Sequence, residues 1–80
     1  MKNLIVSGAS RGIGRAIALK FASEGWNVAF CSRNINNLLA LEKELEVVQP
    51  EGKYLAYVCD VSNQKEVKDF AHAAIKFLGV

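Results

Sequence analysis

Residues 7–14 read Ser-Gly-Ala-Ser-Arg-Gly-Ile-Gly, and this stretch is the strongest indication of the fold in the chain. It follows the apolar run Leu4-Ile5-Val6, which is typical of a strand buried on both faces of a parallel sheet. After it, apolar residues recur at helical spacing until Gly25, which supplies a helix stop. The apolar positions of this helix are Ile13, Ile17, Ala18, Phe21 and Ala22. A glycine-rich turn between a strand and a helix presents backbone N–H groups to an anion, so the stretch predicts a phosphate-binding turn.

Two further strand–helix pairs follow along the chain. We expect strands at residues 27–31 and 54–59, and helices that begin after the capping residues Asn34 and Ser62. This β-α-β-α-β-α order with short connections predicts parallel strands joined by right-handed helical crossovers. The predicted fold class is α/β, a three-layer αβα Rossmann-type doubly wound parallel sheet of which this chain forms a βαβαβα portion.

The composition limits the class of protein. The chain has 80 residues and a net charge of +2, and no apolar run approaches the roughly 20 residues of a membrane span. The apolar stretch at residues 4–6 is too short for a signal peptide, so we expect a cytoplasmic protein without a membrane partner. No basic run with interleaved aromatic residues is present, and we expect no nucleic-acid partner. Cys31 and Cys59 lack metal-ligand spacing, so we expect buried structural thiols and no metal site.

The glycine spacing in residues 7–14 is GxxxGxG and differs from the GxGxxG of long-chain dehydrogenases. With Ser7 in place of the usual threonine, the stretch resembles the Thr-Gly-x-x-x-Gly-x-Gly signature of the short-chain dehydrogenase/reductase family. The similarity runs from Leu4 to the end of the chain and covers about the first third of a typical member. It implies that Asp60, after the third strand, hydrogen-bonds the adenine amino group. The candidate cofactor-binding residues are Gly8, Ser10, Arg11, Gly12, Ile13, Gly14, Ser32, Arg33, Asp60 and Val61.

The end of the second predicted strand decides which nucleotide the chain binds. An NAD site places an acidic side chain there to hold the ribose 2′-hydroxyl, whereas an NADP site needs a cation and no carboxylate. Ser32 takes the place of the acid, Arg33 follows it, and Arg11 lies in the glycine turn. Two guanidiniums can hold a 2′-phosphate through charge-assisted hydrogen bonds, so we expect NADP(H). The alternative is that both are solvated surface charges, as we expect for Arg15.

The resemblance implies an NADP-dependent enzyme that reduces a carbonyl or oxidises a secondary alcohol, similar to 3-oxoacyl-carrier-protein reductases. The family's catalytic Ser, Tyr and Lys follow the third helix, with the Lys four residues after the Tyr. Neither Tyr54 nor Tyr57 has a lysine at that offset, so we expect no catalytic residue in residues 1–80.

We expect residues 1–80 to be the N-terminal part of a single dinucleotide-binding domain, with the catalytic part outside this sequence. In a sheet of order 3-2-1-4 the first strand would pair with a fourth, which this chain does not contain. The resemblance also implies a homodimer or homotetramer. Two alternatives stay open: a non-catalytic NADP-binding module of the same fold, and a structural segment that binds nothing.

Overall fold

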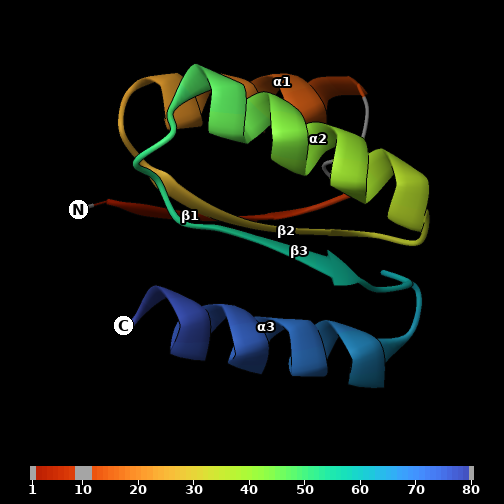
Figure 1. The fold of residues 1–80 in the computed structure, drawn as a ribbon. Coiled ribbons are helices and arrows are strands. Elements are labelled where there is room, and N and C mark those ends of the chain that lie inside the picture. Colours follow the sequence, from red (N-terminus) through yellow and green to blue (C-terminus); the bar gives the residue numbers. More distant parts are fainter. Residues whose placement is uncertain (1, 9–11, 80) are drawn as a thin grey trace.

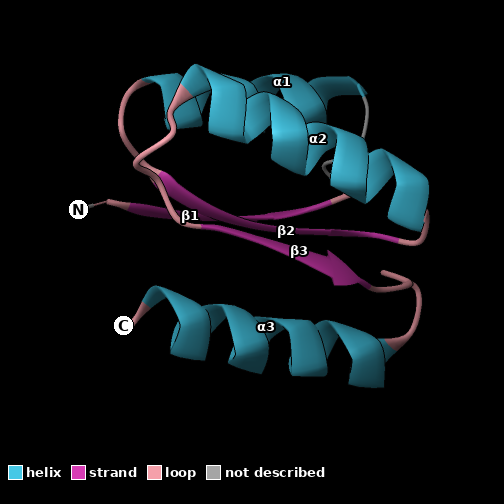
Figure 2. Cartoon of the chain, in the orientation of Figure 1, coloured by secondary structure: helices cyan, strands magenta, loops and turns pink. Residues whose placement is uncertain are grey.

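The computed structural model describes residues 2–8 and 12–79. Strands and helices alternate along the chain as β1 (Asn3–Ser7), α1 (Gly12–Ser23), β2 (Asn27–Ser32), α2 (Ile35–Val48), β3 (Tyr54–Val58) and α3 (Gln64–Leu78). The strands are parallel and pair in the order β1-β2-β3. Helices α1 and α2 cover one face of the sheet and α3 covers the other (Figure 1, Figure 2). The predicted three-layer α/β fold is therefore confirmed.

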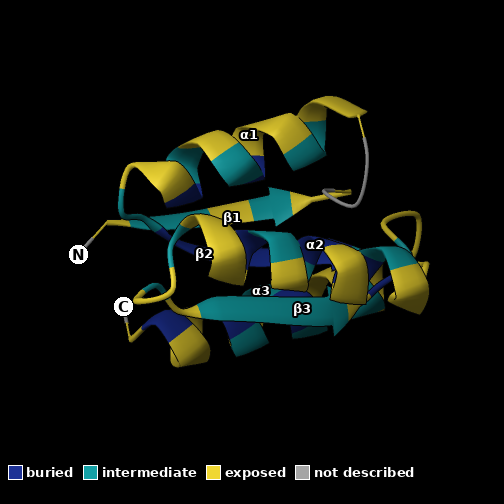
Figure 3. Cartoon of the chain, turned by 45° about the horizontal axis from the view of Figure 1, so that its top comes forward, coloured by how far each residue is buried: buried dark blue, intermediate teal, exposed yellow. Residues whose placement is uncertain are grey.

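The central strand β2 joins two hydrophobic cores, because successive side chains of a strand point to opposite faces of the sheet. Val28 and Phe30 pack with α1 and α2, and Ala29 and Cys31 pack with α3. All four side chains are fully buried, and β2 lies between the partly exposed strands β1 and β3 (Figure 3). The first core contains Ala18, Ala22, Val28, Phe30, Leu38, Leu41 and Leu45. The second contains Ala29, Cys31, Cys59, Phe70, Ala74 and Leu78.

The two later helices begin with asparagine caps. Asn34 caps α2 as predicted, since its side-chain oxygen accepts a hydrogen bond from the Asn37 N–H at 3.1 Å. The prediction that Ser62 caps α3 is wrong, because Asn63 is the cap and accepts from the Glu66 N–H at 3.2 Å. Helix α3 begins at Gln64, so Ser62 lies one residue before the cap position, and its N–H and hydroxyl donate to the Asp60 carboxylate.

The start of α1 is more exposed than its apolar periodicity predicts. The Ile13 side chain is 81% exposed, because α1 packs into the core further along, through Ala18 and Ala22. Arg15 was expected to face solvent, but it forms an ion pair with Glu44 that joins α1 to α2, and both side chains are partly exposed. None of the helices in the described ranges is long and apolar enough to cross a membrane.

Asn27 ties the three strands together at the amino end of the sheet. It is the only buried polar residue found within residues 2–8 and 12–79. Its side-chain amide donates to the Asn3 side-chain oxygen at 3.1 Å, and its own oxygen accepts from the Lys53 N–H at 2.9 Å. These contacts satisfy the buried amide, and they hold the edge opposite the one where the predicted site residues lie.

Candidate functional site

The three strands end side by side at the carboxyl edge of the sheet (Figure 1). The Gly8 N–H donates to the Cys31 carbonyl at 2.9 Å, and the Cys59 N–H donates to the Ser32 carbonyl at 2.9 Å. The loops that follow the three strands therefore begin next to one another. In open α/β sheets ligands bind outside this edge, and the described residues Gly8, Ser32 and Arg33 lie at it.

The glycine turn after β1 has the backbone conformation that requires glycine. Gly8 has a φ of 66° and Gly12 has a φ of 68°, both in the left-handed region that other residues adopt only with strain. Gly12 opens α1 and Gly14 lies in its first turn. The first N–H groups of a helix have no partner within the helix and carry partial positive charge. The first N–H groups of α1 therefore lie at the helix end next to the sheet edge where β1 ends.

Two of the predicted site residues in this turn, Ser10 and Arg11, lie outside the described residues. Ile13, in the first turn of α1, leaves most of its side chain accessible beside the glycines. The assignment of all three residues to a cofactor remains a prediction.

The end of β2 carries a positive charge and no acidic residue. Ser32 is the last residue of the strand, and its hydroxyl oxygen accepts a hydrogen bond from the Asn34 N–H at 3.2 Å. Arg33 follows and is exposed. The chain supplies no carboxylate between residues 31 and 36, so this part of the edge favours an anion.

Asp60 is a strong hydrogen-bond acceptor at the end of β3. Hydrogen bonds from the Ser62 hydroxyl and then from the Ser62 N–H lower the pKa of its carboxyl group, and the nearby Arg33 guanidinium lowers this pKa further. Asp60 is therefore ionised at neutral pH, and it lies close to the cation at the end of β2. Val61 follows and is about half exposed.

The two cysteines behind this edge are free and buried, as predicted. Burial, and to a smaller extent the neighbouring Cys31 thiol, raise the pKa of the Cys59 thiol to about 11. A thiol with this pKa is neutral at pH 7 and does not act as a nucleophile. Within the described residues, no group of three or more His, Cys, Asp or Glu side chains could hold a metal ion.

One contact in the β3–α3 loop was not anticipated from the sequence. The Glu66 carboxylate accepts a hydrogen bond from the Asp60 N–H at 3.0 Å. A capping box, an N-cap followed three residues later by glutamate, would direct Glu66 to the N–H of Asn63 and not to that of Asp60, so no sequence signal predicts this contact.

Residues 2–80 match the protein family described as short chain dehydrogenase. The chain belongs to the short-chain dehydrogenase family. This finding confirms the resemblance carried by the glycine spacing of residues 7–14.

Relatives within the short-chain dehydrogenase family cover almost all of this chain. The NADPH-dependent pterin aldehyde reductase of Arabidopsis thaliana is 33% identical over 79 residues, which are 99% of this chain and 31% of that protein. The glucose 1-dehydrogenase of Gluconobacter oxydans is 38% identical over 78 residues, 98% of this chain and 29% of that protein. This chain therefore spans less than a third of the length of either relative.

A solved structure of the same family has the same fold over this segment. It is an NADPH-bound short chain oxidoreductase from Pseudomonas aeruginosa PAO1, which is similar to this chain with a TM-score of 0.92 and 37% sequence identity. The match covers 98% of this chain and 30% of that one.

Proposed function

We propose that the complete protein is an NADP(H)-dependent oxidoreductase that reduces a carbonyl or oxidises a secondary alcohol. Residues 1–80 form the N-terminal part of its single dinucleotide-binding domain in this proposal. Membership of the short-chain dehydrogenase family supports the reaction class. The share of the relatives that this chain covers supports a catalytic part outside these residues.

The observation that carries the proposal is the pair of left-handed glycines where β1 passes into α1. At Gly8 and Gly12 the backbone turns sharply without a side chain, and the first N–H groups of α1 point out of the helix end. A diphosphate fits such a site because several backbone donors and the helix dipole act on it together. We assign the diphosphate to Gly8, Gly12, Ile13 and Gly14, and we include Ser10 on the sequence alone.

The choice of NADP(H) over NAD(H) rests on the end of β2. Arg33 is exposed there, and Ser32 stands where an acid would repel a phosphate. We propose that Arg33, with Arg11 from the glycine turn, binds the ribose 2′-phosphate through charge-assisted hydrogen bonds. A relative and a solved neighbour that are named for NADPH support this choice.

The end of β3 supplies the adenine contact. Asp60 is ionised and accepts hydrogen bonds, so we propose that its carboxylate binds the adenine amino group, with Val61 packing beside the ring. When bound, NADPH supplies the hydride that reduces the carbonyl. In this scheme the described residues bind and orient the cofactor and perform no proton transfer.

The proposal extends to a substrate class and not to one substrate. The relatives are named for substrates as different as a pterin aldehyde and glucose. Small carbonyl compounds and secondary alcohols are therefore the substrates to test, and 3-oxoacyl thioesters belong among them. We also propose that the complete protein is a dimer or tetramer, which light scattering after size-exclusion chromatography will determine.

Calorimetric titration of the complete protein with NADPH and NADH tests the function, followed by turnover assays on a panel of carbonyls. We expect NADPH to bind more tightly than NADH and to be consumed with at least one carbonyl. Binding without turnover on any substrate would instead support a non-catalytic NADP-binding module. Absence of binding to either nucleotide would leave a structural role.

A further inference from the structure

The loop between β3 and α3 is held in one conformation by its own polar groups. The Asp60 carboxylate oxygen Oδ1 accepts hydrogen bonds from the Ser62 N–H at 2.9 Å and from the Ser62 hydroxyl at 2.7 Å. The Asn63 N–H donates to the Asp60 carbonyl at 2.9 Å. Among the described residues none donates a hydrogen bond to the other carboxylate oxygen, Oδ2, which leaves that oxygen available to a ligand.

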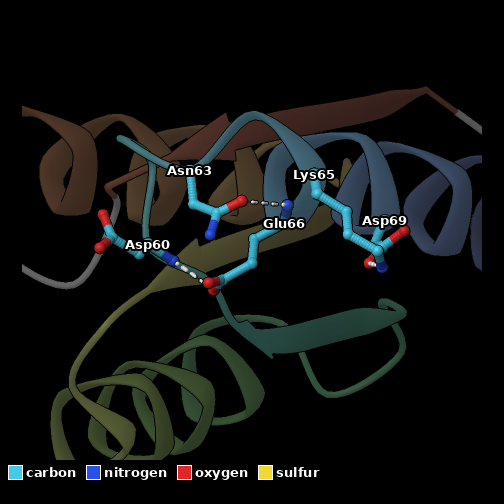
Figure 4. A network of polar contacts seen from close by, with 5 residues as sticks. All are labelled: Asp60, Asn63, Lys65, Glu66 and Asp69. Carbon is cyan, nitrogen blue, oxygen red and sulfur yellow. Dashed lines mark hydrogen bonds and ion pairs between the residues drawn. The ribbon is translucent and has the colours of Figure 1, made fainter.

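Glu66 links this loop to the first turn of α3 (Figure 4). Its carboxylate oxygen Oε1 accepts a hydrogen bond from the Asp60 N–H at 3.0 Å, and its own N–H donates to the Asn63 side chain at 3.2 Å. The Asp60 backbone is therefore fixed from two sides, by Glu66 at its N–H and by Asn63 at its carbonyl.

Helix capping alone does not explain the Glu66 side chain. In a capping box the glutamate binds the N–H of the cap residue itself. Here the N–H of the cap residue Asn63 already donates to the Asp60 carbonyl, and Asn63 itself caps α3. The Glu66 carboxylate reaches three residues further back, to the residue that we assign to adenine.

We propose that Glu66 is a positioning residue that fixes the Asp60 backbone so that Oδ2 of Asp60 faces the adenine amino group. The inference rests on the proposed function, because it assumes a dinucleotide at this edge. It gives Glu66 a role in base selectivity, exerted through Asp60 and without contact to the cofactor.

The test measures dissociation constants of the complete protein for two cofactors. One is NADPH, and the other is its analogue with unsubstituted purine in place of adenine, which carries a hydrogen atom where adenine has the amino group. The ratio of the two constants reports the amino-group contact and is insensitive to a general loss of stability. We expect the unaltered protein to bind NADPH more tightly than the analogue.

The decisive variant is Glu66→Ala. We expect its NADPH affinity to fall roughly tenfold, as for one lost hydrogen bond to a charged group, while its affinity for the analogue changes little. Glu66→Gln keeps an oxygen acceptor at the same position and is expected to restore the ratio. Glu66→Asp keeps the charge but is one methylene shorter, so we expect the same loss from it, and it replaces Glu66→Ala if that variant does not fold.

The matched control is Lys65→Ala, which removes an ion pair between Lys65 and Asp69 at 2.9 Å on the same helix (Figure 4). We expect it to keep the ratio of the unaltered protein. An unchanged ratio in Glu66→Ala or Glu66→Asp, or an equal fall in Lys65→Ala, would overturn the inference. So would an unaltered protein that binds both cofactors equally well. If the unaltered protein binds neither cofactor, the proposed function itself fails.

Discussion

The Cys59 N–H donates a hydrogen bond to the Ser32 carbonyl at 2.9 Å, and this bond ties the exit of β3 to the exit of β2. The residues one step further along, Asp60 and Arg33, therefore begin their loops side by side. Their proximity has an electrostatic consequence, because the Arg33 guanidinium contributes to the lowered pKa of Asp60. A carboxylate and a guanidinium are thus held at adjacent places on one edge.

Gly12→Ala in the complete protein tests the glycine turn. Alanine at a φ of 68° is strained, so we expect a loss of about 1–2 kcal/mol in the free energy of unfolding. We also expect NADPH affinity to fall, because the added side chain would lie where we propose that the backbone approaches the diphosphate. Chemical denaturation and calorimetry measure the two effects.

Gly25→Ala is the matched control for this variant. Gly25 has a φ of 91°, in the same left-handed region, but it lies in the turn between α1 and β2, at the opposite edge of the sheet. We expect a similar loss of stability with unchanged NADPH affinity. Equal losses of affinity in both variants would show that the effect comes from stability and not from the turn.

Ser32→Asp combined with Arg33→Ala tests the choice of nucleotide. The new carboxylate repels a 2′-phosphate and accepts hydrogen bonds from a 2′-hydroxyl, while the phosphate loses a guanidinium. We expect NADPH affinity to fall roughly tenfold to a hundredfold, as for a lost hydrogen bond to a charged group, and NADH affinity to rise. Undiminished NADPH affinity in the double variant would refute the assignment of Arg33.

Cys59 gives a pH dependence of stability with a definite sign. In the unfolded chain this thiol ionises near its ordinary pKa of 9.0, but in the folded chain its pKa is about 11. The unfolded state therefore releases the proton first, and raising the pH through this window favours unfolding. We expect the contribution of Cys59 to be complete below pH 9 and to be lost as the pH rises towards 11.

Denaturation curves of the unaltered protein and of Cys59→Ala, recorded at several pH values, measure this contribution. Lysine and tyrosine residues titrate in both proteins, so the difference between the two isolates the thiol. We expect the stability of the unaltered protein relative to the variant to fall between pH 9 and 11. Two curves that stay parallel across this window would contradict the buried, neutral thiol.

Asn27→Ala tests the polar link at the amino end of the sheet. The substitution removes the contacts with Asn3 and with the Lys53 N–H from a buried position. We expect a loss of about 1–3 kcal/mol in the free energy of unfolding, because a buried hydrogen-bonded group is removed. NADPH affinity should be unchanged, since Asn27 lies at the edge opposite the site. A stability within error of the unaltered protein would contradict the role given to this amide.

The order of strands and helices could be predicted from the sequence because each element carries a local signal. The branched apolar run at Leu4-Ile5-Val6, the glycine turn and the helical periodicity that follows act within a few residues of one another. The cap at Asn34 could be predicted for the same reason, because its side chain caps the helix that begins at the next residue. The predicted strands differ from the observed ones by no more than one residue at each end.

The contacts that could not be predicted depend on groups that other parts of the fold bring close. Ser62 and Asn63 both have the chemistry of a cap, and the cap is Asn63 because α3 begins at Gln64, after the turn in which Ser62 binds Asp60. Arg15 looks like a surface residue on its own helix, and only the packing of α1 beside α2 brings Glu44 to it. The burial of Asn27 could not be predicted either, because it comes from the strands on both sides of β2.

The most direct measurement is a crystal structure of the complete protein with NADPH. We expect the diphosphate oxygens to lie about 2.7–3.2 Å from backbone nitrogens at the start of α1, and the 2′-phosphate to contact the Arg33 guanidinium. A cofactor bound away from the Gly8–Gly14 turn, such as in the apolar groove lined by Leu19 and Val47 between α1 and α2, would contradict the proposed site.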